Sequence, residues 1–376
     1  MLPTLLKRKN QFIEFIELPI TDTPWFLKDK ILPSLDGWRA IAILLVVLSH
    51  LRISAPSVFD IYRRIAAYLF FGGLGVQIFF VLSGFLITTL LIREKQRNGK
   101  INIKAFFIRR SLRIFPVLYL YLSILFIINY YLNLKLNICY FLGPALYIQN
   151  FAPFGSVWLI GHTWSLGVEE QFYLIWPFLF LKLKRSIYVV TIILLIIPII
   201  TVLSYSNNEL NTILLVPFLK PASSIFYGAL MSIFVYKLHH RIDFKQILYK
   251  RFVFLAVLIT YFAEYYTSQG KFSKLLLPFG DTLTNISICY VILYSLIQRN
   301  SILFKVLNSK IAVELGIISY SLYIWQQLFI LPIGTSKYLE QFSFFPINVI
   351  LALLIALLSY HGFEKPFLKM KAKFSL

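Results

Sequence analysis

The stretch Leu35-Asp36-Gly37-Trp38-Arg39-Ala40-Ile41-Ala42-Ile43-Leu44-Leu45-Val46-Val47-Leu48-Ser49-His50 decides the fold. It is an apolar run of helical length with charge at its start and a histidine at its end, a pattern typical of a transmembrane helix. Similar runs follow, and 59% of the 376 residues are hydrophobic whereas only 14% are charged. That charge cannot cover the surface of a soluble protein of this size, and the composition also excludes a disordered chain. We therefore predict an all-α polytopic transmembrane helical bundle.

Ten transmembrane spans are predicted from the apolar runs. They cover roughly residues 37–53, 70–92, 114–133, 170–182, 187–204, 212–236, 252–267, 281–298, 316–334 and 344–362. Glycines before the short fourth span suggest a re-entrant segment around 155–169. Pro217 and Pro221 predict a kink in the sixth span, which also holds Lys220.

The net charge of +21 is explained better by membrane topology than by nucleic-acid binding. Of the 37 Lys and Arg, 28 fall in segments that are cytoplasmic if the N-terminus is inside, and 7 fall in external segments. We predict that both termini are cytoplasmic. The organisation expected is a cytoplasmic or interfacial tail over 1–34, a membrane domain over 35–366 and a short cytoplasmic tail over 367–376, with no soluble domain after the last span.

Ionisable groups at membrane depth cost about 2.5–3.5 kcal/mol each, so those in the first span are candidate functional residues. Arg39 and His50 are eleven residues apart, which places both on one helix face about 16 Å apart along the axis. Asp36 shares that face. A neutral His inside a bundle is a natural acid or base. The alternatives are an interfacial Asp36–Arg39 salt bridge and a His50 that merely marks the outer helix end.

The second span is rich in glycine and carries Gln77 and Ser83. Glycines at this density favour close helix packing. The two polar side chains either hydrogen-bond between helices or line a pocket, and the sequence leaves both possibilities open.

A third polar cluster runs from Gly161 to Tyr173 and includes His162, Trp164, Glu169 and Glu170. Adjacent carboxylates on a helix point about 100° apart, so one can face the bundle while the other faces water. Alternatively, at least one of them pairs with the positive end of the helix dipole.

The loop predicted over 93–113 carries eight basic residues and one acid, Glu94. If its end is helical, Arg110 and Arg113 at i, i+3 can form a two-pronged clamp on a phosphate. The alternative is a solvated loop whose positive charge reflects only the membrane topology.

These segments together resemble the acyltransferase-3 family of membrane acyltransferases, which O-acylate cell-surface sugars. The resemblance runs in order over about 35–366. The matching blocks are Leu35–Ala40 with His50 at the R-x10-H spacing, Gly75–Ile87, Arg110–Pro116, His162–Leu166 continuing through Val168–Tyr173, Ile318–Gln327 and Glu364–Pro366. The first four blocks are highly specific, and the last two are weaker.

The resemblance implies about ten helices that pass an acyl group, commonly acetyl, from cytoplasmic acyl-CoA to a hydroxyl of a cell-surface or lipid-linked glycan. It implies a multi-pass protein of a bacterial plasma (inner) membrane. The lipid bilayer, acyl-CoA and the glycan are the expected partners, without nucleic acid, a permanently bound cofactor or a metal.

The residues carried over from the family take these roles. His50 is the expected general base or transient acyl carrier, and Glu169 orients its imidazole or positions the acceptor. Arg39, Arg110 and Arg113 bind the donor's phosphates. The residues expected to line the pocket are Asp36, Gln77, Ser83, His162 and Trp164.

One departure concerns Gln326, because some family members have a His at this position; we assign it no catalytic role. The competing function is a transporter or flippase for a lipid-linked sugar, with Arg39, Lys220, His50 and Glu169 along its path.

Overall fold

A computed structural model of the chain describes residues 20, 22–54, 60–151, 155–182, 186–204, 217–268, 273–332, 334–335 and 338–374. Within these ranges every regular element is a helix and there is no strand, which confirms the predicted all-α class. Most of the predicted interfacial tail, residues 1–19, lies outside the described residues.

Six helical segments in the described part of the chain are long and apolar enough to cross a membrane. They are Leu35–Ser54, Ile61–Asn98, Ile103–Leu132, Pro217–Leu238, Phe279–Ile297 and Ile347–Lys371. The chain is therefore a multi-pass membrane protein. Each of the ten predicted ranges overlaps a helix, but the count of ten spans and the cytoplasmic position of both termini stay predictions.

The chain divides into two compact units. The first unit, named here the histidine unit, contains Leu35–Phe79, Asn102–Gln171 and Val306–Leu376, and the second, the α11 unit, contains Met1–Ser34, Phe80–Ile101 and Phe172–Lys305. Three helices contribute residues to both units: α4 (Gly72–Asn98), α8 (Trp164–Lys182) and α15 (Ile302–Leu307).

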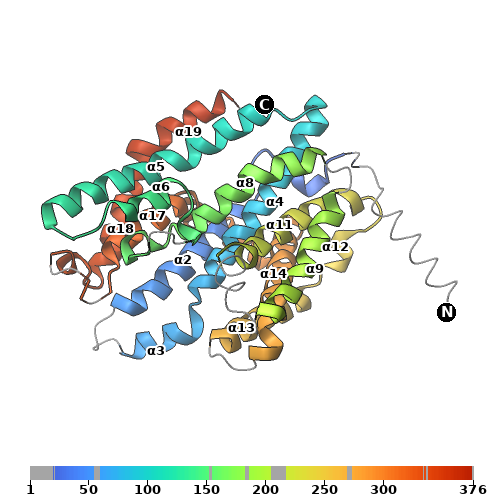
Figure 1. The fold of residues 1–376 in the computed structure, drawn as a ribbon. Coiled ribbons are helices and arrows are strands. Elements are labelled where there is room, and N and C mark those ends of the chain that lie inside the picture. Colours follow the sequence, from blue (N-terminus) through green and yellow to red (C-terminus); the bar gives the residue numbers. More distant parts are fainter. Residues whose placement is uncertain are drawn as a thin grey trace. The chain divides into compact units, whose positions relative to one another are not determined.

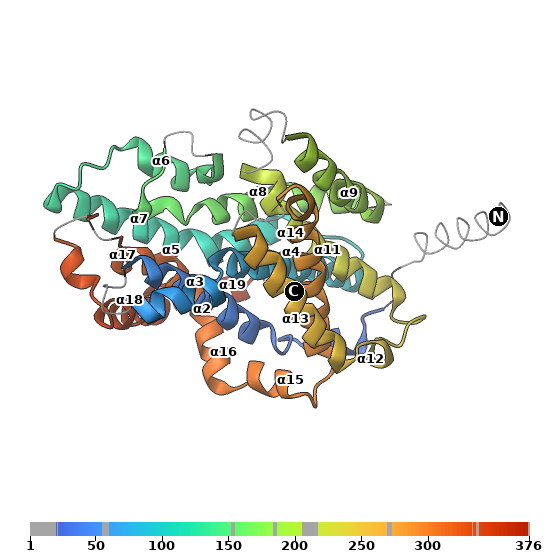
Figure 2. The ribbon, with the colours of Figure 1, turned by 90° about the horizontal axis from the view of Figure 1, so that it is seen from below.

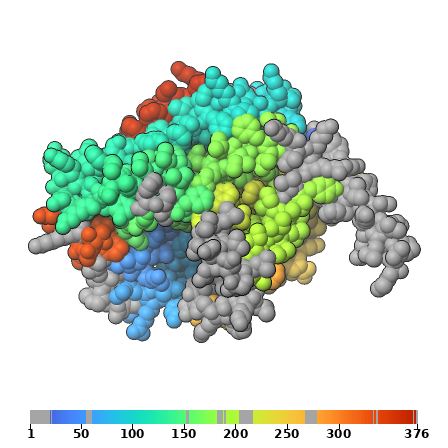
Figure 3. All heavy atoms as spheres, in the orientation of Figure 1, coloured from blue at the N-terminus to red at the C-terminus, as the bar shows by residue number. Residues whose placement is uncertain are grey.

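The histidine unit is built around α2 and α17. Its helices are α2 (Leu35–Ser54), α3 (Asp60–Leu69), α5 (Ile103–Leu132), α6 (Cys139–Ala145), η3 (Gln149–Phe151), α7 (Trp158–Gly161), α16 (Lys310–Ile317), α17 (Ser319–Phe329), η5 (Glu340–Phe342), α18 (Ile347–Leu358), η6 (Ser359–Glu364) and α19 (Lys365–Ala372). Helix α2 packs against α16 and α17, and α17 packs against α18 (Figures 1 and 2). Helix α19 lies along α5 (Figures 1 and 3).

Glycine permits the contact between α2 and α16. A Cβ atom on Gly37 would overlap the carbonyl of Leu307, and one on Gly316 would overlap the carbonyl of Asp36. Helix α2 can therefore approach α15 closely at Gly37 and α16 closely at Gly316 only because both positions lack a side chain.

The α11 unit contains η1 (Trp25–Leu27), α9 (Ser186–Ser204), α11 (Lys220–Leu238), α12 (Phe244–Ile247), α13 (Lys250–Ser268) and α14 (Ser273–Ile297). Two hydrogen bonds between buried polar side chains join its helices. The Trp176 indole N–H donates to Thr88 Oγ1 at 2.9 Å, and Thr89 and Ser232 share a hydroxyl hydrogen bond of 2.9 Å. Helices α4 and α11 meet through Gly84, so this glycine of the second predicted span serves close packing.

The structure corrects one prediction of local structure and adds detail to another. The predicted loop over 93–113 is wrong, because α4 continues to Asn98 and α5 begins at Ile103. Arg, Lys, Glu and Gln are good helix formers, and the side chain of Asn102 caps α5 by accepting a hydrogen bond from the Ala105 N–H at 3.0 Å. The predicted kink at Pro217 coincides with a π-helical turn over 217–219 that leads into α11.

The tight contact at Gly84 predicts a stability effect. Gly84→Ala is expected to destabilise the protein by about 1–3 kcal/mol, because the new Cβ overlaps the backbone carbonyl of Ile225 in α11. Gly73→Ala on the same helix is the matched control, since nothing lies within 4 Å of a Cβ placed there. Thermal unfolding in detergent, followed by circular dichroism, measures both. Equal midpoints for the two variants would contradict the packing described.

Candidate functional site

His50 lies one turn before the end of α2 and is held by two side chains of the histidine unit. Its Nδ1 atom is 3.1 Å from the amide oxygen of Gln326 on α17. Its ring meets the edge of Trp158 with the ring centroids 5.1 Å apart. Because an amide oxygen can only accept, Nδ1 carries the proton in this contact and Nε2 keeps a lone pair.

His162, at the end of α7, has a parallel arrangement. Its Nδ1 atom is 2.7 Å from the amide oxygen of Gln327, the residue that follows Gln326. The Tyr323 hydroxyl donates to the backbone carbonyl of His162 at 2.8 Å and also shares a 2.8 Å hydrogen bond with Ser165. His162 lies outside the six candidate spans, and burial lowers its pKa to about 4, so its ring is neutral at pH 7.

The two histidines share one cavity of about 470 Å³. Trp158, Trp164, Tyr323 and Gln327 contribute to its wall, together with residues of α2 and the first turns of α4. The structure thus brings together His50, His162 and Trp164, three of the residues selected from the sequence. The cavity is large enough for a small polar group of a substrate beside the rings.

Sequence reasoning missed the part played by α17. Residues 326 and 327 are adjacent on a helix and therefore point about 100° apart, which lets each glutamine reach a histidine on a different element. Gln326 and Gln327 are both buried. A buried pair of amides at the end of an otherwise apolar helix was the available signal, because polar groups in such an environment need partners.

Glu169 is not among the residues that line this cavity within the part of the chain that the structure describes. Its charge acts on Tyr320 and Tyr323 of α17. The amide of Gln326 contacts Nδ1 of His50. Both roles expected of Glu169, orienting the imidazole or positioning the acceptor, stay predictions.

Two further pocket candidates are not among the described residues that line this cavity. Among its described lining residues α4 contributes Gly72, Gly73 and Val76 and not Gln77. Ser83 belongs to the α11 unit. Asp36 instead forms a salt bridge with Arg39, with Nη1 2.5 Å from Oδ1, which is the ion pair considered as the alternative from the sequence.

The three predicted donor-binding arginines belong to one basic cluster. The charges of Arg39, Arg109, Arg110 and Arg113 all act on Lys371 of α19. Arg110 and Arg113 lie on α5, so the condition for an i, i+3 pair on a helix is met. The cluster therefore joins α2, α5 and α19 and offers several cations to one anionic ligand.

The two weaker motif blocks meet beside this cluster. The Ser321 hydroxyl of α17 donates to the Glu364 carboxylate, and the Tyr320 hydroxyl donates to the Ile114 carbonyl at 2.7 Å. The charge of Arg113 also acts on Glu364. These contacts fix α17, and with it both glutamines, relative to α5 and η6.

The sequence profile of the Acyl_transf_3 family, an acyltransferase domain, matches residues 32–361. The chain belongs to this acyltransferase family. The matched range contains both histidines, both glutamines and every arginine of the basic cluster. The family resemblance read from the motifs is thereby confirmed.

Several curated relatives of this acyltransferase are named O-acetyltransferases. The chain is 33% identical over 217 residues to the peptidoglycan O-acetyltransferase OatA of Listeria monocytogenes, covering 53% of this chain and 31% of the relative. It is 28% identical over 375 residues to O-acetyltransferase OatA of Staphylococcus aureus, covering 90% and 58%. The chain thus spans less than two thirds of the length of these relatives. No solved structure matches it.

The contact between His50 and Gln326 predicts the effect of changing the glutamine. Gln326→Leu removes the acceptor for Nδ1–H and is expected to lower kcat about 10- to 100-fold. Gln326→His, which restores a ring nitrogen as acceptor, is expected to recover most of the loss. Acyl transfer by membranes containing equal amounts of each protein measures both variants. An unchanged kcat in the Gln326→Leu variant would contradict the positioning role of Gln326.

Proposed function

We propose that the chain is a membrane O-acetyltransferase that moves an acetyl group from acetyl-CoA to a hydroxyl of peptidoglycan or another envelope glycan. The family of the chain and the names of its relatives support acetyl as the transferred group and peptidoglycan as the first acceptor to test. The same relatives support a bacterial plasma membrane as its location. The observation that carries the chemistry is the pair of amide-held histidines on one cavity.

His50 acts as the general base in this proposal. Gln326 accepts from Nδ1–H, so the lone pair of Nε2 is available to a substrate hydroxyl. The hydroxyl proton moves to Nε2 as the hydroxyl oxygen forms a bond to the thioester carbonyl carbon. The carbon–sulfur bond then breaks, and the CoA thiolate leaves and takes up the proton. The products are the acetyl ester and free CoA, and the base is regenerated.

His162 contributes a neutral polar side chain to the wall of the cavity that His50 also lines. Its contact with Gln327 also assigns the proton to Nδ1. We propose that its neutral ring positions the acceptor or the thioester and does not compete with His50 for the proton. Its burial at 3% exposure fits a fixed wall of the cavity better than a mobile acid.

The basic cluster of α2, α5 and α19 is the proposed site for the phosphates of CoA. CoA is a polyanion, and guanidinium groups bind phosphate oxygens in pairs. Arg39 and His50 stand on one face of α2, about 16 Å apart along the axis. That spacing suits a donor whose phosphates and thioester lie at opposite ends of an extended pantetheine arm.

Transport of a lipid-linked sugar is the competing function. It needs charged side chains along a path, but Arg39 is paired with Asp36. Lys220 is likewise paired with Asp281, with Nζ 3.2 Å from Oδ2. The ion pair at Lys220 favours a structural role for that cation, so one of the charges needed along a transport path is already neutralised, which supports catalysis over transport.

Replacement of His50 tests the catalytic proposal. His50→Ala is expected to abolish acetyl transfer from labelled acetyl-CoA to envelope glycan, a loss of at least about 100-fold, while the protein still inserts in the membrane. His361→Ala, at an exposed histidine, is the matched control and should keep full activity. Activity like the wild type in the His50 variant would exclude the proposed base. Acid quenching of the wild type distinguishes direct transfer from a transient acyl-histidine, which would retain the label.

Donor binding is tested separately by thermal stability. Acetyl-CoA at 100 times its Kd is expected to stabilise the purified protein by about 2.7 kcal/mol. The double variant Arg110→Ala/Arg113→Ala is expected to lose most of this shift. Arg64→Ala, at an exposed arginine on α3, is the control. Unchanged stabilisation of the double variant by acetyl-CoA would show that the phosphates bind elsewhere. The absence of any stabilisation of the wild type would favour transport.

A further inference from the structure

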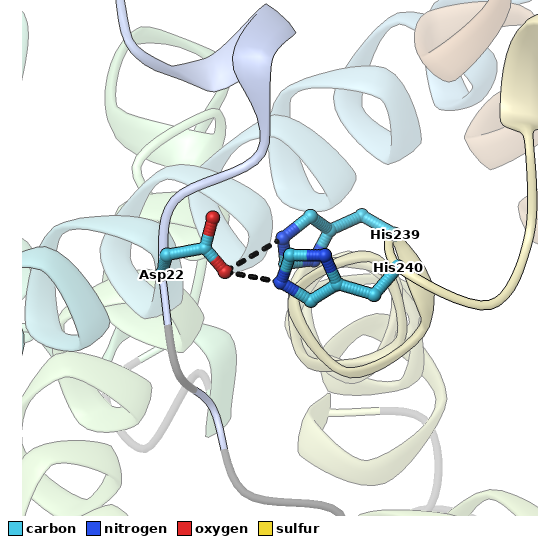
Figure 4. Close-up of side chains that lie close together, drawn as sticks. All are labelled: Asp22, His239 and His240. Atoms are coloured by element: carbon cyan, nitrogen blue, oxygen red, sulfur yellow. Dashed lines mark hydrogen bonds and ion pairs between the residues drawn. The ribbon is translucent and has the colours of Figure 1, made fainter.

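A second group of potential ligands lies in the α11 unit. Asp22 precedes η1, His239 ends α11, and His240 follows directly (Figure 4). Nε2 of His239 is 3.0 Å from Oδ1 of Asp22, and Nε2 of His240 contacts the same oxygen. One potential ligand atom from each of the three residues lies within 4.8 Å of the other two. Residues separated by 217 positions therefore converge on one point.

The donor set suits a transition metal. Two imidazole nitrogens and one carboxylate oxygen are common ligands of Zn²⁺ and of neighbouring first-row ions. Ligand bonds of about 2.0–2.2 Å place such donors roughly 3–3.5 Å apart around a tetrahedral ion. The three side chains can reach that spacing by small rotations, and positions remain for water or an exogenous ligand.

The surroundings of His239 give an independent indication. Its Nδ1 atom is 3.1 Å from the carbonyl oxygen of Tyr236, and a carbonyl can only accept. Nδ1–H can donate to this carbonyl, so the Nε2 edge of the ring faces Asp22. This is the arrangement in which protein backbones usually hold a metal-binding imidazole.

We propose that Asp22, His239 and His240 bind one divalent first-row transition-metal ion, with Zn²⁺ the best match to the donor set. The ion fastens the segment before η1 to the C-terminal end of α11. No metal is among the partners expected from the sequence. This site is independent of the proposed acetyl transfer.

Nearby charges shape the expected affinity. Asp22 also lines an open cavity of about 450 Å³ with Lys28, Arg93 and Arg97. These basic groups weaken the binding of a free cation by repulsion. They also favour an anion such as chloride or phosphate as the ligand that completes the coordination. We therefore expect the affinity to depend on the anion in the buffer.

The test is a titration of the full-length protein, purified in detergent without a histidine tag, with Co²⁺. The expected result is one Co²⁺ per chain with visible ligand-field absorption that Zn²⁺ displaces. His240→Ala and Asp22→Asn are each expected to weaken binding at least about tenfold, because each removes one of three protein ligands. The His240 side chain is 60% exposed, so its removal should leave the fold intact. His361→Ala is the matched control and should bind like the wild type.

A thermal readout separates coordination from a simple ion pair. Zn²⁺ should raise the unfolding midpoint of the wild type and of the His361 variant, but not that of the His240 variant. The proposal is overturned if the wild type binds no stoichiometric Co²⁺, or if binding survives unchanged in both ligand variants. Either result would assign the contact to protonated histidine beside Asp22.

Discussion

Polar side chains in an apolar helical bundle must find their partners within the protein, because hydrocarbon offers no hydrogen bonds. The contacts of this acyltransferase follow from that constraint. Lys220 is paired with Asp281, and Trp176 with Thr88. Most such pairs only stabilise the bundle. His50 differs because Gln326 satisfies Nδ1, while the ring borders a cavity in which Nε2 can meet a substrate.

Helix α2 links the proposed chemistry to the proposed donor site. It carries Arg39 near its start and His50 near its end, so their separation is set by helical rise and not by loop conformation. Gly37 lets α2 pack against the backbone of α15, and Gly316 lets α16 pack against the backbone of α2. A rigid helix fixed in this way can hold a polyanionic group and a reacting carbonyl at a constant distance.

Helix α17 has the complementary role. It is anchored through Tyr320 to α5 and through Ser321 to Glu364, and its last turn supplies both glutamines. The resemblance left Gln326 without a role because some family members have histidine there. The structure shows why glutamine suits the position: its amide oxygen reaches His50, as a ring nitrogen could.

The sequence by itself determined the class of the protein and its family. Scarce charge and long apolar runs specify an all-helical membrane protein through the cost of burying unpaired polar groups. The order of motifs specified the acyltransferase family. It also placed Arg39 and His50 on one face, since helical periodicity is local.

Only the tertiary structure decided which distant residues meet. His50 lies 276 positions from Gln326, and Asp22 lies 217 positions from His239. No local pattern encodes such pairs, because they depend on how separate helices pack. The same packing places Gln326 beside His50, and Arg110 and Arg113 lie on helix α5 where a loop was expected.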